Sequence, residues 1–473
     1  MDHQVYRFIK VRVRAALIIL ALSDFAVCLA SVLLAIYIRF DGQSLDTIES
    51  IESPILTGVV FGMVIPPSIA AMGLYQSHFR GSLHAILLRT VAGFFCGCAV
   101  LATLYYLFPA LNLGRGALGL AMGIAFFFIA MLHAFFFKYL ERHETRVRVL
   151  VLGTGNHAAS INRRMRRKSD RRRFRLIGFI ILPGESERIV DGDLILEHSN
   201  QDLLQLCKEH KIDEIVTAAD AGTTALPVEQ LLEARFRGVR ITDIVTFHER
   251  EQRKLPIELF NCDSLIYADG FGNRWFWDYV KRCVDVIVSA IVFIFVWPII
   301  LLTAISIVIE DGKDQPILYR QTRVGRNGRK FMVLKFRSMR TDAEASGVAQ
   351  WATESDSRIT RVGNIIRQLR IDELPQLFNV LTGDMSLVGP RPERPYFVEK
   401  LSIEVPHYEK RHTVLPGITG WAQINYPYGR SLSDSMRKQE FDLYYIKNRS
   451  LFLDFLILLQ TTEVVLFKSG QAR

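Results

Sequence analysis

Residues 284–309 read VDVIVSAIVFIFVWPIILLTAISIVI, a largely apolar run that contains Pro298. At ~1.5 Å per residue the run is long enough to cross ~30 Å of hydrocarbon. Proline removes a backbone donor and clashes with the preceding helical turn, so a kink is predicted at Pro298. A helix bent there would enter the cytosolic leaflet and return to the same side of the membrane.

The basic residues that follow this run indicate on which side of the membrane it ends. Residues 311–340 contain nine Lys or Arg and only two acids, Asp311 and Asp314. Because basic segments stay on the cytoplasmic side, a straight fifth crossing would place this block outside. We therefore predict a re-entrant helix over 284–309, and a straight span with inverted topology is the alternative. Either arrangement brings the next domain to the bilayer and favours a lipid-linked substrate.

Four further apolar segments precede this run, at about 15–38, 55–75, 86–108 and 117–137. Each is long enough to span a membrane. Basic side chains lie before the first segment and after the fourth, whereas the loop to the second segment is acidic. By the positive-inside rule both ends are cytoplasmic. Residues 1–140 are therefore predicted to form a four-helix transmembrane bundle.

From residue 147 to about 265, strand-like and helix-like segments alternate. Val147–Leu152 leads into the turn Gly153-Thr-Gly155-Asn-His-Ala158. The further predicted strands are Ile177–Leu182, Ile212–Ala218 and Val239–Ile244. This order predicts a parallel, Rossmann-like α/β domain. The acidic residue that would bind a ribose after the second strand is absent, so a spacer or regulatory domain is favoured over a cofactor-binding one.

The net charge of +10 would suit nucleic acid, but the sequence has no zinc-finger spacing and no RNA-binding aromatic signature. Basic residues beside membrane segments account for the charge, so nucleic acid is not a predicted partner. The six cysteines are scattered and form neither a disulfide framework nor a metal site. A reducing cytosolic face fits this cysteine usage.

The residues suited to phosphate chemistry gather in the last third of the chain. The cationic candidates are Lys335, Arg337, Arg370 and Arg391. Arg391 stands between two prolines, which suits rigid, bidentate phosphate recognition. With a divalent cation, one of the adjacent carboxylates Asp372 and Glu373 can hold the metal while the other acts as nucleophile or base. A surface salt-bridge cluster is the alternative, disfavoured because prolines, glycines and arginines crowd around these carboxylates.

Two later segments complete the candidate site. Leu415–Asn425 is a glycine-punctuated loop with one aromatic residue and Gln423, which could bind a nucleobase or form a structural turn. Residues 441–459 are predicted to form an amphipathic helix that lies against the membrane surface. This helix would contribute Asp442 or Asp454 to the site.

At this point the sequence resembles the bacterial sugar transferase family, the monotopic phosphoglycosyl transferases. The resemblance covers 275–473 and is carried by KFRSM (335–339), RIDELPQLFNVLTGDMSLVGPRPE (370–393), LPGITGWAQIN (415–425) and FDLYYIKNRSLFLD (441–454). It implies a mainly helical catalytic domain over 275–473. The preceding bundle and the α/β domain over 147–265 are similar to those of larger members that initiate exopolysaccharide or O-antigen synthesis. The stretch at 246–271 together with QINYPYG (423–429) resembles the subgroup associated with exosortase loci.

The resemblance implies a two-step transfer of sugar-1-phosphate from a UDP-sugar to undecaprenyl phosphate, with UMP released. Asp372 would be the nucleophile and Glu373 would hold Mg²⁺. The phosphate-binding side chains would be Lys335, Arg337 and Arg391. Arg430 is offset from the Asn-Gly-Arg turn of many relatives, which leaves its contact with uridine or phosphate open. The expected location is the bacterial inner (cytoplasmic) membrane, with the catalytic domain on the cytoplasmic face and the chain as a homodimer.

Two other functions compete with the transferase. A membrane-anchored nucleotide-sugar dehydratase or epimerase would need a Tyr-x-x-x-Lys pair beside its cofactor, and the one match considered, Tyr396…Lys400, lies far beyond the glycine turn. A non-enzymatic scaffold for polysaccharide assembly is the second competitor. The adjacent carboxylates and the Gly-Pro-Arg-Pro segment argue against a scaffold.

Overall fold

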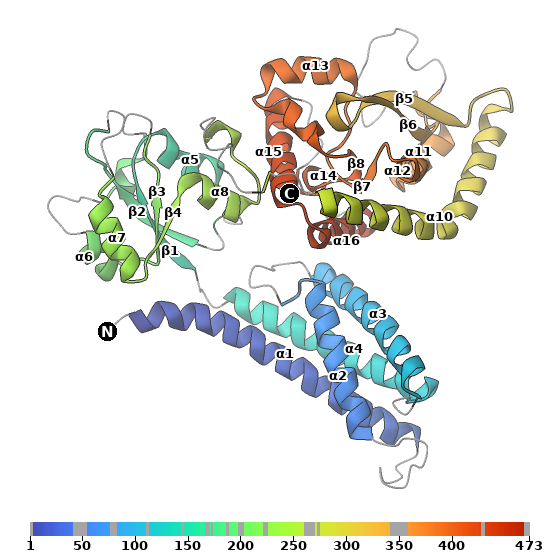
Figure 1. The fold of residues 1–473 in the computed structure, drawn as a ribbon, viewed down its shortest axis with the longest axis horizontal. Helices are drawn as coiled ribbons and strands as arrows, with labels where there is room; N and C mark the ends of the chain where they lie inside the picture. The colour runs from blue at the N-terminus through green and yellow to red at the C-terminus, as the bar shows by residue number, and fades with distance from the viewer. Residues whose placement is uncertain are drawn as a thin grey trace. The chain divides into compact units, whose positions relative to one another are not determined.

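The computed structural model divides into two compact units, Met1–Phe247 and His248–Arg473 (Figure 1). The first unit contains four long helices and a parallel sheet, and the second contains the candidate site. The described residues are 3–40, 54–75, 83–109, 113–142, 146–165, 171, 174–185, 189–196, 203–220, 226–259, 270–271, 275–340, 358–426 and 431–467.

The prediction of four N-terminal apolar helices is confirmed. They are α1 (His3–Arg39), α2 (Pro54–Ala71), α3 (Leu83–Leu107) and α4 (Arg115–Arg142), and each contains a stretch apolar enough to span a membrane. Glycines let these helices approach closely. A Cβ at Gly62 of α2 would lie 2.8 Å from the Phe25 ring of α1, and one at Gly97 of α3 would lie 2.6 Å from Ile65 of α2. Small residues at such contacts are typical of helix packing in membranes.

A buried polar cluster joins α1, α4 and the segment after α2. His133 Nε2 lies 2.7 Å from Asp24 Oδ2, and the Tyr75 hydroxyl donates to the same oxygen. Asp24 and His133 are fully buried. Because an unpaired carboxylate is costly inside a membrane, this pairing accounts for an acid within an apolar helix.

The parallel α/β domain is also confirmed. Its four strands lie in the order β2-β1-β3-β4 and all pair in parallel. They are β1 (Val147–Leu152), β2 (Phe174–Ile180), β3 (Glu214–Thr217) and β4 (Arg240–Asp243), with helices α5 (Asn156–Arg164), α6 (Leu203–Glu209), α7 (Val228–Phe236) and α8 (Ile244–Gln252). The second strand begins three residues before its predicted start. Its first residue, Phe174, is buried and packs edge-on against Phe247.

The second unit is mainly helical and has two small sheets. β5 (Leu318–Val324) and β6 (Lys330–Phe336) form an antiparallel hairpin, and β7 (Ser386–Val388) pairs in parallel with β8 (Gly417–Thr419). The helices are α10 (Trp275–Asp311), α11 (Arg361–Gln368), α12 (Gln376–Thr382), α13 (Pro395–Glu404), α14 (Trp421–Asn425), α15 (Leu432–Asn448) and α16 (Leu451–Phe467). A hydrophobic cluster from β6, α12, β7, α14, α15 and α16 joins these elements into one core.

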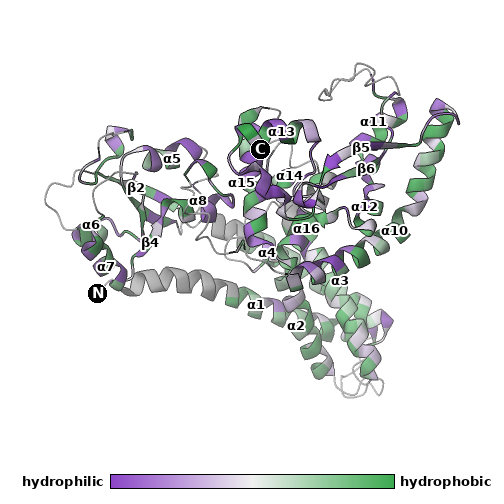
Figure 2. Cartoon of the chain, turned by 45° about the horizontal axis from the view of Figure 1, so that its top comes forward, coloured by the Kyte–Doolittle hydropathy of each residue, from purple (hydrophilic) through white to green (hydrophobic). Residues whose placement is uncertain are grey.

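The apolar run 284–309 lies within one long helix, α10, with Pro298 inside it. Figure 1 shows that α10 changes direction along its length, and Figure 2 shows that its residues are largely hydrophobic. Its most apolar window is only 11% buried within the chain. Such an apolar surface without a protein partner suits contact with lipid.

Residues 248–259 belong to the second unit, whereas the sequence placed 147–265 together. Leu255 is fully buried in the core of the second unit, and its N–H donates to the Glu440 carbonyl at 3.0 Å. Lys254 Nζ lies 3.0 Å from the Glu440 carboxylate. These contacts with α15 explain why the division falls at His248.

Candidate active site

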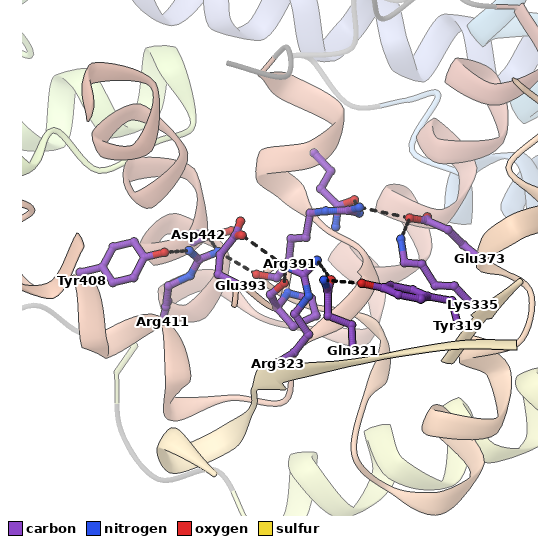
Figure 3. A network of polar contacts seen from close by, with 12 residues as sticks. Tyr319, Gln321, Arg323, Lys335, Glu373, Arg391, Glu393, Tyr408, Arg411 and Asp442 are labelled. Atoms are coloured by element: carbon purple, nitrogen blue, oxygen red, sulfur yellow. Dashed lines mark hydrogen bonds and ion pairs between the residues drawn. The ribbon is translucent and has the colours of Figure 1, made fainter. Parts of the chain in front are cut away.

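The centre of the candidate site is the Glu373 carboxylate, which two cations contact. Lys335 Nζ, from β6, donates to Glu373 Oε1 at 2.7 Å, and Arg391 Nη2 donates to the same oxygen at 3.1 Å (Figure 3). Arg391 Nη1 also donates to Gln423 Oε1, 3.1 Å away on α14. Four of the residues predicted from separate motifs are therefore brought together.

Asp372 and Glu373 stand on a short 3-10 turn, η6 (Ile371–Glu373). Arg370 precedes it with a φ of 59°, in the left-handed region that non-glycine residues rarely adopt. Such strain is common at functional sites. Pro375 is the N-cap of α12, so the turn is held between a strained residue and a helix start.

The two carboxylates differ in their electrostatic surroundings. Burial and the neighbouring Glu373 charge raise the pKa of Asp372, although Lys335 opposes the shift. Burial would also raise the pKa of Glu373, but Arg391 and Lys335 outweigh it and hold that pKa well below its usual range. Burial lowers the pKa of Lys335, and Glu373 opposes that shift. Glu373 is therefore a fixed anion, whereas Asp372 is the more basic carboxylate.

Two of the predicted site residues retain unused hydrogen-bonding capacity. Asp372 Oδ1 is buried without a hydrogen-bond partner in the described part of the chain. Arg337 lies 2.6 Å from Asp311 through Nη2, while its buried Nε and Nη1 have no partner among the described residues. Buried polar atoms of this kind are costly unless a ligand, ion or water satisfies them.

Asp442 and Asp454 are buried and form ion pairs away from Glu373. Asp442 Oδ2 lies 2.8 Å from Arg411, and Asp454 Oδ2 lies 2.6 Å from Lys281 of α10. Burial raises the pKa of Asp442 to about 6, although Arg411 opposes the shift. The structure therefore places both aspartates in supporting ion pairs. Arg430, the predicted site residue that is offset from the Asn-Gly-Arg turn of many relatives, lies outside the described residues.

The tryptophan loop has a structural role in this arrangement. Trp421 is 3% exposed, its indole N–H donates to the Arg253 carbonyl at 2.8 Å, and its ring stacks on Tyr444. Since the ring is buried and its N–H is engaged in the core, the structural turn is the better of the two sequence interpretations for Trp421. Gln423 from the same loop reaches Arg391.

Sequence reasoning missed Arg323, Arg411 and Asp311 as members of the site. Arg323 shares one face of β5 with Tyr319, which is paired in register with Lys335. The alternation of side chains along a strand could have indicated Arg323 once the hairpin was known. Arg411 and Asp311 are joined to the site through contacts distant in sequence, for which no local pattern exists.

The glycine turn of the α/β domain is closed by two acidic side chains of the same chain. The Asp220 carboxylate accepts from the N–H groups of Asn156 and His157 at 2.6 and 2.8 Å. Glu185 accepts from the Thr154 N–H at 2.9 Å. These groups lie where a cofactor phosphate would bind a helix N-terminus. The arrangement favours the spacer or regulatory interpretation of this domain.

Fold and site together define a membrane protein with a partly buried cluster of carboxylates and cations suited to phosphate. The model of the family described as bacterial sugar transferase matches residues 276–468. The chain is 48% identical over 192 residues to the UDP-N-acetylgalactosamine-undecaprenyl-phosphate N-acetylgalactosaminephosphotransferase of Aeromonas hydrophila, covering 41% of this chain and 45% of that protein. It is 35% identical over 330 residues to the undecaprenyl-phosphate glucose phosphotransferase of Komagataeibacter xylinus, covering 68% of this chain and 59% of that protein.

A third relative is covered more completely. The UDP-glucose:undecaprenyl-phosphate glucose-1-phosphate transferase of Caulobacter vibrioides is 41% identical over 191 residues, which is 40% of this chain and 70% of that protein. The chain belongs to the bacterial sugar transferase family, in a large form with N-terminal helices. It aligns with less than two thirds of the length of the Aeromonas and Komagataeibacter proteins.

Proposed function

We propose that the chain transfers a sugar-1-phosphate from a UDP-sugar to undecaprenyl phosphate and releases UMP. The observation that carries this proposal is the convergence of Lys335 and Arg391 on one oxygen of Glu373, next to Asp372 with an unused buried oxygen. Phosphoryl transfer depends on positioning and on neutralising phosphate charge, and this cluster supplies both. The names of the relatives describe the same class of transfer.

The reaction would proceed in two displacements. An Asp372 oxygen attacks the sugar-bearing phosphorus, an O–P bond forms, and the bridging P–O bond breaks with its electron pair leaving on UMP. A phosphate oxygen of undecaprenyl phosphate then attacks the same phosphorus and releases the Asp372 carboxylate. The raised pKa of Asp372 makes it a better nucleophile than an ordinary aspartate, provided that it is deprotonated. A carboxylate nucleophile also spares two anionic substrates from meeting directly.

Magnesium fits this donor set. Mg²⁺ is usually held by one or two carboxylates together with substrate phosphates and water. Both cations contact Glu373 Oε1, and Asp372 Oδ1 has no hydrogen-bond partner among the described residues. Glu373, with Asp372 beside it, would hold the ion. Bound there, Mg²⁺ would neutralise negative charge on the phosphates.

The lipid acceptor would reach the site along α10, which we propose is re-entrant. Near its start, Lys281 and Asp285 contact Asp454 and Ser386 of the second unit. At its end, Glu310 accepts from the backbone of α11, and Asp311 pairs with Arg337. Because both ends contact the same compact unit, a straight crossing of ~30 Å of hydrocarbon does not fit. The catalytic unit would lie on the cytoplasmic face of the inner membrane.

Other assignments remain proposals. The sugar is open, since the relatives' names include both N-acetylgalactosamine and glucose. The exosortase-associated exopolysaccharide subgroup and the homodimer stay predictions from the sequence. The dehydratase alternative gains no support, because Asp220 and Glu185 already accept from the N–H groups of the glycine turn.

The test is UMP release by the purified full chain with Mg²⁺, undecaprenyl phosphate and a panel of UDP-sugars. Release from one donor, lost in Asp372→Asn, would support the reaction and identify the sugar. No release from any donor, with an acceptor shown to be active on a related enzyme, would contradict the proposal. Undiminished polymer formation in cells carrying Asp372→Asn would instead favour the scaffold.

A further inference from the structure

The loop that presents Arg391 is held at four successive carbonyl oxygens. Gly417 N–H donates to Pro390 O at 2.9 Å, and Val324 N–H donates to Glu393 O at 3.0 Å. Between them, Arg411 Nη2 donates to Arg391 O at 3.0 Å and Arg323 Nη1 donates to Pro392 O at 3.1 Å. The two middle carbonyls are therefore held by guanidinium groups.

Arg411 is buried, and its guanidinium contacts three groups. Nη1 donates to the Tyr408 hydroxyl at 2.6 Å, while Nη2 reaches both Arg391 O and the Asp442 carboxylate, 2.8 Å away. Only 7% of its side chain is exposed. The planar fork of an arginine can serve several acceptors with fixed geometry, whereas a lysine ammonium cannot reproduce that arrangement.

Arg323 approaches the same loop from β5. Its Nη1 lies 3.6 Å from Glu393 Oε2 as well as contacting Pro392 O, and its Nη2 donates to Gln321 Oε1 at 2.7 Å. Gln321 in turn donates to the Tyr319 hydroxyl at 3.0 Å. In Figure 3 these side chains form a continuous polar row from Lys335 and Glu373 past Arg391 to Arg411 and Asp442.

We propose that Arg411 and Arg323 are positioning residues that fix the Arg391 guanidinium toward Glu373 and the substrate phosphates. This inference rests on the proposed function. The prolines at 390 and 392 lack N–H groups, so the loop has few backbone donors of its own and depends on donors to its carbonyls. Asp442 and Glu393 act as the counter-ions of the two positioning arginines. Asp442 would thus act on the reaction through Arg411 and Arg391 rather than by touching phosphate.

The first test is the kinetics of Arg411→Lys and Arg323→Lys in UMP release. Each variant keeps the positive charge but loses the fork. A shift of about 1 Å in a positioned group costs on the order of 100-fold in rate, so kcat/KM for the UDP-sugar should fall by up to that factor. Arg320→Lys is the matched control, because Arg320 is exposed on the opposite face of β5 and should keep wild-type kinetics.

The decisive test is a double-mutant cycle with Arg391→Ala, read as calorimetric affinity for UDP in the presence of Mg²⁺. A positioning residue has nothing to position once the Arg391 side chain is removed. Arg411→Lys should therefore weaken UDP binding in the wild-type background and leave it unchanged in Arg391→Ala. The same loss in both backgrounds would overturn the inference.

Further measurements distinguish a folding defect from a loss of function. Thermal unfolding checks each variant, and Arg323→Lys carries the cycle if Arg411→Lys does not fold. If the wild-type chain releases UMP but the effects of the two substitutions on UDP affinity are additive, only the positioning role is contradicted. A wild-type chain that neither releases UMP nor binds UDP contradicts this inference and the proposed function together.

Discussion

At the scale of residues, Asp372 and Glu373 are adjacent in sequence but differ in basicity. Lys335 and Arg391 stabilise the Glu373 anion, whereas burial and the Glu373 charge disfavour ionisation of Asp372. Environments that separate two neighbouring pKa values commonly divide two chemical roles between the groups. The proposed division is an anionic anchor at Glu373 and a nucleophile at Asp372.

This division predicts the acid limb of the pH profile. The nucleophile must be deprotonated, and its raised pKa means that protonation begins at a higher pH than for an ordinary aspartate. The value of kcat/KM for UMP release should therefore rise with pH through a midpoint above the ordinary aspartate pKa. Kinetics of the full chain between acid and neutral pH measure this midpoint. A limb at or below the ordinary aspartate pKa would contradict the assignment.

A substitution at Trp421 tests whether this side chain is structural or contacts a nucleobase. Trp421→Phe removes the donor to the Arg253 carbonyl and part of a buried ring, so it should cost on the order of 2 kcal/mol of stability. The midpoint of thermal unfolding should fall while the affinity for UDP is kept. Trp275→Phe is the matched control, because Trp275 is 73% exposed and should leave the midpoint unchanged. Weaker UDP binding with an unchanged midpoint would instead support a nucleobase contact.

At the scale of elements, α10 is the helix on which the membrane arrangement depends. Its early residue Lys281 and its last residue Asp311 both pair with side chains of the second unit. Proline inside a helix commonly produces a sharp bend, and the direction of α10 changes along its length (Figure 1). The sequence predicted this helix and its proline, and the structure adds the contacts that hold the two ends.

Labelling from the two sides of the membrane tests the arrangement of α10. In a chain whose six cysteines are replaced by serine, Tyr279→Cys and Lys313→Cys flank the apolar part of α10. A membrane-impermeant maleimide applied to intact spheroplasts should label neither, because both positions should be cytoplasmic. Arg115→Cys, at the start of α4, should be labelled and serves as the control. Labelling of Lys313→Cys from outside would indicate a straight span.

At the scale of the whole molecule, local sequence patterns were sufficient for the architecture but not for the supporting contacts. Apolar length predicted α1 to α4 and α10, and strand-helix alternation predicted the parallel sheet. Motifs identified Lys335, Glu373, Arg391 and Gln423, which the structure brings together. The pairing of Asp442 with Arg411 joins residues 31 positions apart through burial, and no periodicity encodes such a pair. The same holds for Asp220, which closes the glycine turn from 64 residues away.

The closed glycine turn predicts that the first unit retains no dinucleotide. Asp220 and Glu185 already accept from the N–H groups that would bind a pyrophosphate. The purified chain should release no NAD on denaturation, measured by chromatography of the supernatant, and should show no calorimetric heat with added NAD. Stoichiometric NAD in the supernatant would contradict this prediction and revive the dehydratase alternative.

The most direct test of the central claim follows the transferred phosphate itself. The full chain is mixed with a UDP-sugar labelled at the sugar-bearing phosphate, first without and then with undecaprenyl phosphate. The account predicts that label appears on the protein as UMP is released, that added lipid takes it up, and that Asp372→Asn shows neither step. Label that passes to the lipid in Asp372→Asn at the wild-type rate would contradict the account.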